Sequence, residues 1–270
     1  MFAPATILLL LVIGALVGLL SGLLGMGGGS LMIPALVLVF DSAGLDADLS
    51  TRMAFGTNLL VGMTTALAGF MVHRRYEERL WGIVLPLAGA SVLGALAGST
   101  VASHLPGALL RVLFGAAVSL VAVNLLLRRE VTREGLPRFS SAVLIPLGLL
   151  IGFAASLVGL GGAVFTTIIL VALLRYPMQH IVAISTFVQT AGAFAACLGY
   201  MLNGLGTAGL PPFSLGYVNL LAAGAMILTG LPLATVGARL THRTPSPVLR
   251  RIFGALLLAI AAVMVWSGLR

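Results

Sequence analysis

Two glycine-rich stretches, Gly25-Met26-Gly27-Gly28-Gly29 and Gly159-Leu160-Gly161-Gly162, interrupt long apolar runs at matching places in the two halves of this chain. Consecutive glycines destabilise a helix by roughly 1 kcal/mol each relative to alanine. Unwound backbone within a membrane is tolerated only where it is buried in protein or lines a cavity. Paired breaks in a hydrophobic chain indicate the substrate site of a transporter. Because a helix that starts after such a break directs its free N–H groups at an anion, we expect a permease for a small anion.

Composition places the chain in a membrane. Of its 270 residues, 60% are hydrophobic and 8% are charged, whereas soluble domains carry about a quarter charged residues. The mean hydropathy is +1.15. Apolar stretches long enough to cross a bilayer, about 20 residues each, recur along the whole chain. We therefore predict an all-α, multi-pass protein of the cell membrane, with about 8–10 transmembrane or half-membrane helices.

The apolar segments predict where the helices lie. Two of them, 30–40 and 163–174, are too short to span ~30 Å of hydrocarbon alone. Each follows a glycine break, so the segments around the breaks should form helical hairpins or broken helices. The full set of segments is 5–24, 30–40, 53–72, 80–103, 108–127, 140–159, 163–174, 181–203, 214–238 and 248–268.

The two halves of the chain, residues 1–135 and 136–270, resemble each other. Ordered matches at a nearly constant offset predict an internal repeat within one membrane domain. Small residues spaced four apart near the breaks should serve close helix packing. The matches pair Gly18, Gly22, Gly25, Gly27 and Gly28 with Gly152, Ser156, Gly159, Gly161 and Gly162; Ala54 to Thr57 with Ala183 to Thr186; and Gly98, Pro106, Arg111 and Phe114 with Gly237, Pro245, Arg250 and Phe253.

The positive charge is arranged by side of the membrane. All 15 basic side chains are arginines, and twelve fall in the connections at 73–80, 128–138, 175–180 and 239–251. The positive-inside rule assigns that side to the cytoplasm. This placement argues against a nucleic-acid partner, and it gives the two halves opposite orientations, as in inverted-repeat transporters. Arg52 and Arg111, near the outer helix ends, should extend to the membrane interface or attract anions to an outer mouth.

The first break resembles the opening motif of the sulfite exporter TauE/SafE family, also described as sulfonate-uptake-type permeases. The motif here is Gly22-Leu23-Leu24-Gly25-Met26-Gly27-Gly28-Gly29-x4-Pro34, followed later by Gly56-Thr57-Asn58. The second half keeps a weaker copy, with Ala163 and Ile168 in place of Gly29 and Pro34. The resemblance covers nearly the whole chain. It implies export or uptake of sulfite, an organosulfonate or a related sulfur-containing oxyanion by alternating access.

Polar groups inside apolar helices are the candidate substrate ligands. An uncharged hydroxyl or amide there either bonds a neighbouring helix, at about 0.6 kcal/mol per contact, or donates to an oxyanion. Thr57 and Thr186 occupy equivalent repeat positions, which favours the second interpretation. Neutral donors also suit an anion that must be released again. The predicted substrate-binding residues are Gly27, Gly28, Gly29, Thr57, Asn58, Gly161, Gly162, Ser185, Thr186 and Gln189.

The ionisable residues exclude several other functions. All seven acidic residues fall in predicted loops, so no intramembrane carboxylate suggests a cation substrate or a proton relay. The four histidines have no second ligand at helical spacing, and we expect no metal and no cofactor. A membrane-embedded enzyme would need a serine or cysteine beside a base, which the sequence does not place at one depth.

Several alternatives remain open at this stage. A permease for another small organic anion, such as a carboxylate, would use the same helix N-termini. A scaffold protein would not need paired breaks. The coupling ion and the oligomeric state, including a homo-oligomer, are not determined by the sequence. The predicted partners are therefore a small anionic substrate and the lipid bilayer.

Overall fold

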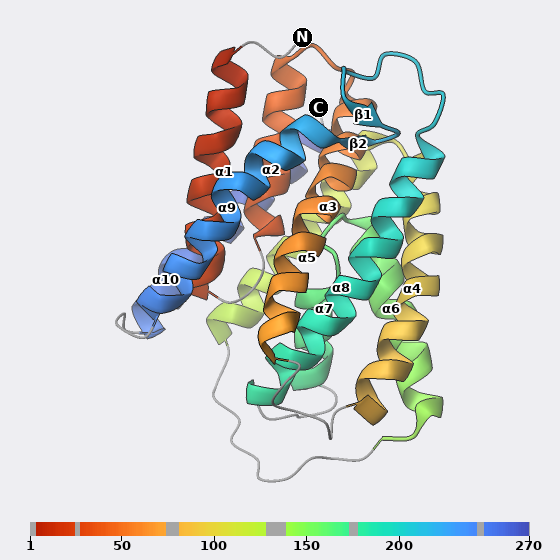
Figure 1. The fold of residues 1–270 in the computed structure, drawn as a ribbon, viewed down its shortest axis with the longest axis vertical. Helices are drawn as coiled ribbons and strands as arrows, with labels where there is room; N and C mark the ends of the chain where they lie inside the picture. Colours follow the sequence, from red (N-terminus) through yellow and green to blue (C-terminus); the bar gives the residue numbers. More distant parts are fainter. Residues whose placement is uncertain are drawn as a thin grey trace.

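A computed structural model describes residues 4–24, 28–73, 81–127, 139–172, 178–241 and 246–269 (Figure 1). These residues form ten helices and one short antiparallel ribbon. The elements are α1 (Pro4–Leu24), α2 (Gly29–Ser42), α3 (Ala47–His73), α4 (Trp81–His104), α5 (Gly107–Leu127), α6 (Ser141–Leu157), α7 (Ala163–Ala172), α8 (Met178–Asn203), β1 (Ser214–Leu215), β2 (Val218–Asn219), α9 (Leu220–Thr241) and α10 (Ser246–Leu269).

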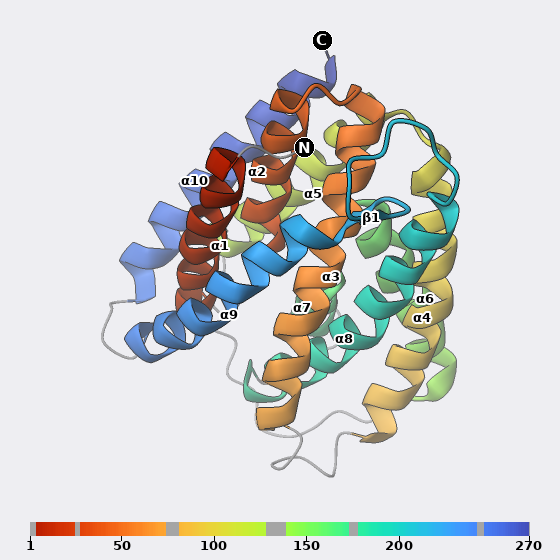
Figure 2. The same cartoon turned by 45° about the horizontal axis from the view of Figure 1, so that its top comes forward.

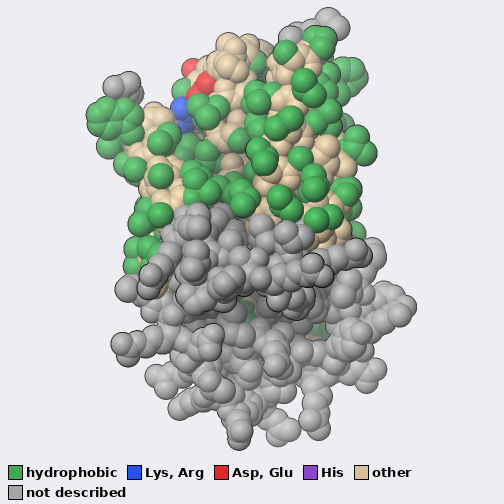
Figure 3. Space-filling model, turned by 90° about the vertical axis from the view of Figure 1, so that its left-hand side faces the viewer, with side chains coloured by type: hydrophobic (Ala, Val, Ile, Leu, Met, Phe, Trp, Pro, Cys, Tyr) green, Lys and Arg blue, Asp and Glu red, His purple; other side chains and the backbone are tan. Residues whose placement is uncertain are grey.

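The prediction of an all-α, multi-pass membrane protein is confirmed. Within the described residues, three helical stretches, Trp81–His104, Gly107–Asn124 and Ile184–Asn203, are long and apolar enough to cross a bilayer. The two helices that follow the breaks are short, as expected: α2 has 14 residues and α7 has 10. Side chains on the outer face of α1, such as Leu8 at 63% and Leu16 at 57% exposure, belong to an apolar surface that suits lipid. Figure 3 shows such side chains spread over the described part of one face.

One predicted segment begins with a different structure. Residues 214–219, expected as the start of a helix, form the ribbon instead, with Ser214 opposite Asn219 and Leu215 opposite Val218. The backbone reverses at Gly216, whose φ is +56°, a conformation that interrupts a right-handed helix. Helix α9 therefore starts at Leu220, and the ribbon lies at one end of the bundle, beside α8 (Figures 1 and 2).

Small residues bring two pairs of helices into close contact. A Cβ atom on Gly18 of α1 would lie 2.2 Å from the carbonyl oxygen of Gly230 on α9. A Cβ atom on Gly152 of α6 would lie 2.1 Å from the carbonyl oxygen of Ser91 on α4. The backbones approach this closely only because both positions are glycines. The packing role expected for Gly18 and Gly152 is thus confirmed.

These two helix contacts are equivalent under the sequence repeat. The correspondence that pairs Gly18 with Gly152 and Gly98 with Gly237 also pairs Gly230 with Ser91. The same holds one helical turn earlier. Gly14 of α1 packs on Met226, and its repeat equivalent, Gly148 of α6, packs on Leu87. The contact of α1 with α9 therefore matches the contact of α6 with α4, as an exchange of the two halves would require. The inverted orientation of the halves stays a prediction, since the arginine-rich connections that indicate it lie largely outside the described residues.

Arg111 does not extend to the interface, which corrects the expectation for this residue. It is 5% exposed, and its guanidinium donates to Asp41 at the end of α2, with N–O distances of 2.9 and 3.1 Å. It also donates to the hydroxyls of Thr51 at 2.8 Å and Ser50 at 2.9 Å on α3. A buried guanidinium needs this number of acceptors. Arg111 therefore fastens the end of α2 and the start of α3 to α5.

Arg52 takes part in the same junction. It donates to the carbonyl oxygen of Leu105 at 3.0 Å, and its guanidinium carbon lies 5.8 Å from the centroid of the Tyr217 ring, a cation–π distance. Asp48 accepts from the backbone N–H of Gly107 at 2.6 Å. These contacts tie the start of α3 to the start of α5 and to the ribbon.

We predict that Arg111→Met destabilises the protein by about 2 kcal/mol, because it leaves Asp41 without its cation. The effect is smaller than for a fully buried pair, since the Asp41 side chain is 35% exposed. Thermal unfolding in detergent measures the loss. The matched Asp41→Asn/Arg111→Met double variant should recover part of it, and a single variant as stable as the parent would contradict the assignment.

Candidate functional site

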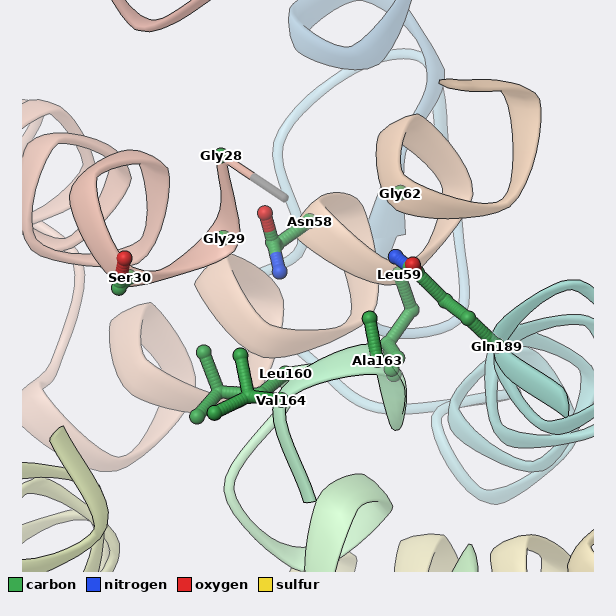
Figure 4. Close-up of a pocket in the computed structure, with 11 residues that line it drawn as sticks. Gly28, Gly29, Ser30, Asn58, Leu59, Gly62, Leu160, Ala163, Val164 and Gln189 are labelled. Atoms are coloured by element: carbon green, nitrogen blue, oxygen red, sulfur yellow. The ribbon is translucent and has the colours of Figure 1, made fainter. Parts of the chain in front are cut away.

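The two glycine breaks meet at one pocket (Figure 4). The empty space between its lining atoms, including the part open to solvent at its mouth, is about 340 Å³. Asn58 and Gln189 lie near the middles of α3 and α8, the two longest helices, so the pocket is placed about half-way along the bundle. The lining residues are Gly28, Gly29, Ser30, Asn58, Leu59, Gly62, Leu160, Gly161, Ala163, Val164 and Gln189.

The second break is shaped by glycines that adopt left-handed backbone conformations. Gly159, Gly161 and Gly162 have φ values of +69°, +74° and +108°, which residues with a side chain rarely adopt. A Cβ atom on Gly159 would also lie 2.7 Å from the Phe55 ring. The break can therefore turn between α6 and α7 only with glycine at these positions.

Hydrogen bonds from neighbouring helices hold the second break in place. The Asn58 side-chain nitrogen donates to the carbonyl oxygen of Gly159 at 2.7 Å. The Tyr200 hydroxyl on α8 donates to the carbonyl oxygen of Ser156 at 3.2 Å. Buried carbonyl groups that leave a helix need such partners. The break is thus a fixed structure between α3 and α8.

Two helix N-termini face the pocket without caps. At the start of α2, the backbone N–H groups of Leu31 and Met32 donate to the Gly28 carbonyl oxygen at 3.1 and 3.0 Å. Gly28 supplies no side-chain cap, and the N–H groups of Gly29 and Ser30 have no acceptor among the described residues. A helix leaves its first N–H groups unpaired unless something else accepts them.

The start of α7 repeats this arrangement on the other side of the pocket. Thr166 donates its N–H to the Gly162 carbonyl oxygen at 2.9 Å, but Ala163 and Val164 have no N–H acceptor within the described part of the chain. Two helix N-termini thus place partial positive charge at one pocket. No Asp, Glu, Arg or His is among the described residues that line it.

Gln189 supplies a polar side chain to the pocket. It is 8% exposed, and its amide has no hydrogen-bond partner among the described residues. Figure 4 shows the amide reaching from α8 toward Gly62 and Ala163. A ligand that accepts hydrogen bonds would give this amide a partner inside the bundle.

The structure brings together five of the ten predicted site residues: Gly28, Gly29, Asn58, Gly161 and Gln189. Gly162 lines a smaller adjoining cavity that shares Gly161. Ser185 and Thr186 lie one turn before Gln189 on α8 and are not among the lining residues of either cavity. Gly27 lies outside the described residues.

Thr57 has a different role from the one predicted. Its hydroxyl accepts the backbone N–H of Asn219 at 3.0 Å, and the residue is fully buried. Because Asn219 belongs to β2, this bond fastens the ribbon to α3 and turns the Thr57 side chain away from the pocket.

Sequence reasoning missed Ser30. Its side chain is 6% exposed, lines the pocket and has no partner among the described residues. Its position directly after the first glycine run could have identified it as a pocket residue. Gly62 was missed as well, and it lies beside Gln189: a Cβ atom there would be in ordinary van der Waals contact with the Gln189 amide nitrogen, at 3.6 Å.

Comparisons with known proteins agree with this architecture. The family model described as Sulfite exporter TauE/SafE matches residues 10–264. A probable membrane transporter protein of Haemophilus influenzae is 28% identical over 261 residues, covering 96% of this chain and 97% of the relative. One from Methanocaldococcus jannaschii is 26% identical, with 92% and 91% covered. The Bacillus subtilis protein YunE, also a probable membrane transporter, is 22% identical, with 97% and 98% covered. No solved structure matches.

We predict that Gly159→Ala destabilises the protein by about 1–3 kcal/mol, since alanine would be strained at this backbone conformation and would collide with Phe55. Gly89→Ala is the matched control, because Gly89 is helical and a Cβ atom there meets nothing within 4 Å. The control should be neutral or slightly stabilising. Thermal unfolding in detergent compares the two, and equal stability would show that the break is not built as described.

Proposed function

This chain belongs to the sulfite exporter TauE/SafE family, and from that premise we propose that it is a permease for a small sulfur-containing oxyanion. The cargo would be sulfite, an organosulfonate or a similar anion, carried across the cell membrane by alternating access. The pocket at the two breaks is the proposed substrate site, and the arginine-rich connections face the cytoplasm.

The observation that carries this proposal is the convergence of two uncapped helix N-termini and the Gln189 amide on one pocket. Each group donates hydrogen bonds, and the described lining contains no cation. An oxyanion accepts several hydrogen bonds at once, and helix N-termini are well suited to it. A cationic substrate would find no counter-charge there, because the described lining holds no carboxylate.

Neutral donors also suit transport rather than storage. A buried arginine would hold an anion through charge-assisted bonds, which are roughly twice as strong as neutral ones. A carrier must bind well enough to select and weakly enough to release. Arg52 and Arg111 both donate to protein partners, Arg52 to the Leu105 carbonyl oxygen and Arg111 to Asp41, and neither lines the pocket.

A carboxylate permease is the second candidate, because backbone N–H groups donate hydrogen bonds to any oxyanion. An enzyme is a more distant one: Ser30 is the only nucleophile among the described lining residues, and no histidine or carboxylate accompanies it there. Acyl or phosphoryl transfer would need such a base.

We predict that proteoliposomes containing the protein take up labelled sulfite or a short organosulfonate faster than empty liposomes. Competition with unlabelled sulfur oxyanions and simple carboxylates ranks the candidate substrates. Stronger competition by carboxylates would favour the second candidate. No protein-dependent flux for any anion in the panel would overturn the proposal.

A second prediction concerns the charge of the pocket. Gln189→Glu preserves the shape of the side chain but replaces a donor with a group that is an anion when ionised, so flux should fall at least about tenfold. Thr190→Val is the matched control on the next position of α8, since the Thr190 hydroxyl bonds the Thr186 carbonyl oxygen within its own helix. Unchanged flux in Gln189→Glu would remove this residue from the site.

A further inference from the structure

The side chain of Asn58 is oriented by one strong constraint. Its nitrogen lies 2.7 Å from the Gly159 carbonyl oxygen, and a carbonyl oxygen only accepts hydrogen bonds. The amide nitrogen must therefore face Gly159, and the amide oxygen must face the other way. Figure 4 shows the oxygen of Asn58 turned to the side of Gly28 and the nitrogen toward the side of Leu160.

Packing reinforces this orientation. Asn58 is 3% exposed, and a Cβ atom on Gly29 would lie 2.8 Å from its nitrogen and 3.5 Å from its oxygen. Glycine at position 29 therefore lets the start of α2 lie against the amide. Turning the amide over would place its oxygen against the Gly159 carbonyl oxygen, and two acceptors in contact repel each other.

The fixed Asn58 amide presents an unpaired acceptor. Its oxygen has no donor among the described residues, although Asn58 lines the pocket. This differs from Gln189, whose amide has no described partner at either atom and can turn its nitrogen to an anion. The Gln189 amide can thus adapt to the ligand, whereas the Asn58 amide is held in one orientation, with one N–H bonded to Gly159 and its oxygen unpaired among the described residues.

We propose that Asn58 determines specificity by selecting oxyanions that carry a hydrogen-bond donor of their own. The substrate class is then a singly charged sulfur oxyanion with a hydroxyl, an amino group or an acidic proton, such as hydrogen sulfite or a hydroxy- or aminosulfonate. The helix N-termini and Gln189 bind the charged oxygens, and the donor of the ligand satisfies the Asn58 oxygen. This inference rests on the proposed function.

The physical basis is the cost of an unmatched buried group. An anion without a donor would place its own oxygens near the Asn58 oxygen and leave that acceptor unpaired. Sites built to bond a ligand hydroxyl reject analogues that lack it for this reason. The expected discrimination is about tenfold to a hundredfold.

The test compares isethionate with ethanesulfonate, which differ by one hydroxyl group. Binding to the purified full chain in detergent is measured by calorimetry at one pH. Isethionate should bind at least about tenfold more tightly. Equal binding, or tighter binding of ethanesulfonate, overturns the inference, and because this comparison uses the unaltered protein, it stands even if a variant does not fold.

Two variants then assign the preference to Asn58. Asn58→Leu, which is similar in size and lacks the acceptor, should bring the two dissociation constants to within about twofold of each other, as in a double-mutant cycle. Gln189→Leu should weaken both ligands and keep their ratio. A ratio that persists in Asn58→Leu overturns the assignment.

The same experiment separates the two proposals. Binding and flux of both sulfonates without discrimination would refute the inference about Asn58 and leave the permease proposal intact. Absence of binding and of flux for every oxyanion in the panel would refute the proposed function itself.

Discussion

Backbone groups within a membrane have no water to bond, and this constraint governs the structure around the breaks. The fold provides partners for the freed carbonyl oxygens, as Asn58 does for Gly159 and Tyr200 does for Ser156. It provides none, within the described residues, for the first N–H groups of α2 and α7. Unpaired groups of this kind are costly in a low-dielectric interior. Under the proposed function the substrate supplies the acceptors, because an oxyanion offers several at once without needing a charged side chain in the pocket.

The rest of the fold keeps this arrangement in position. Glycine contacts join α1 to α9 and α6 to α4 at backbone distance, so the segments leading into each break are firmly packed. Near the end of α2, Arg111 joins this helix, which begins at the pocket, to α3 and α5. Beneath Arg111 lie the fully buried rings of Phe55 and Phe114, with centroids 6.0 Å apart. The ion pair of Arg111 with Asp41 thus stabilises the junction of α2, α3 and α5, while the described lining of the pocket contains no charged side chain.

Hydropathy and glycine clustering predicted most of the fold, because bilayer thickness and helix geometry leave few solutions for an apolar chain. Most helix boundaries followed from the apolar segments. Two starts differ by six residues: α3 begins at Ala47 rather than at 53, and residues 214–219 form a ribbon, with positive φ values at Phe213 and Gly216. Side-chain direction was harder to predict. Thr57 and Asn58 are adjacent polar residues in one apolar helix, yet one bonds the ribbon and the other lines the pocket. The burial of Arg111 depends on its ion pair with Asp41, which lies seventy positions away in the chain. A local sequence pattern does not predict such a long-range pair.

The most direct test of the central claim is to locate a bound anion. Crystals of the unaltered protein soaked in selenite, a heavier analogue of sulfite, would reveal its position by the anomalous scattering of selenium. The account predicts a peak in the pocket, within hydrogen-bond distance of the N–H groups at the starts of α2 and α7 and of the Gln189 amide. A peak beside Arg52 or Arg111, with the pocket empty, would contradict it.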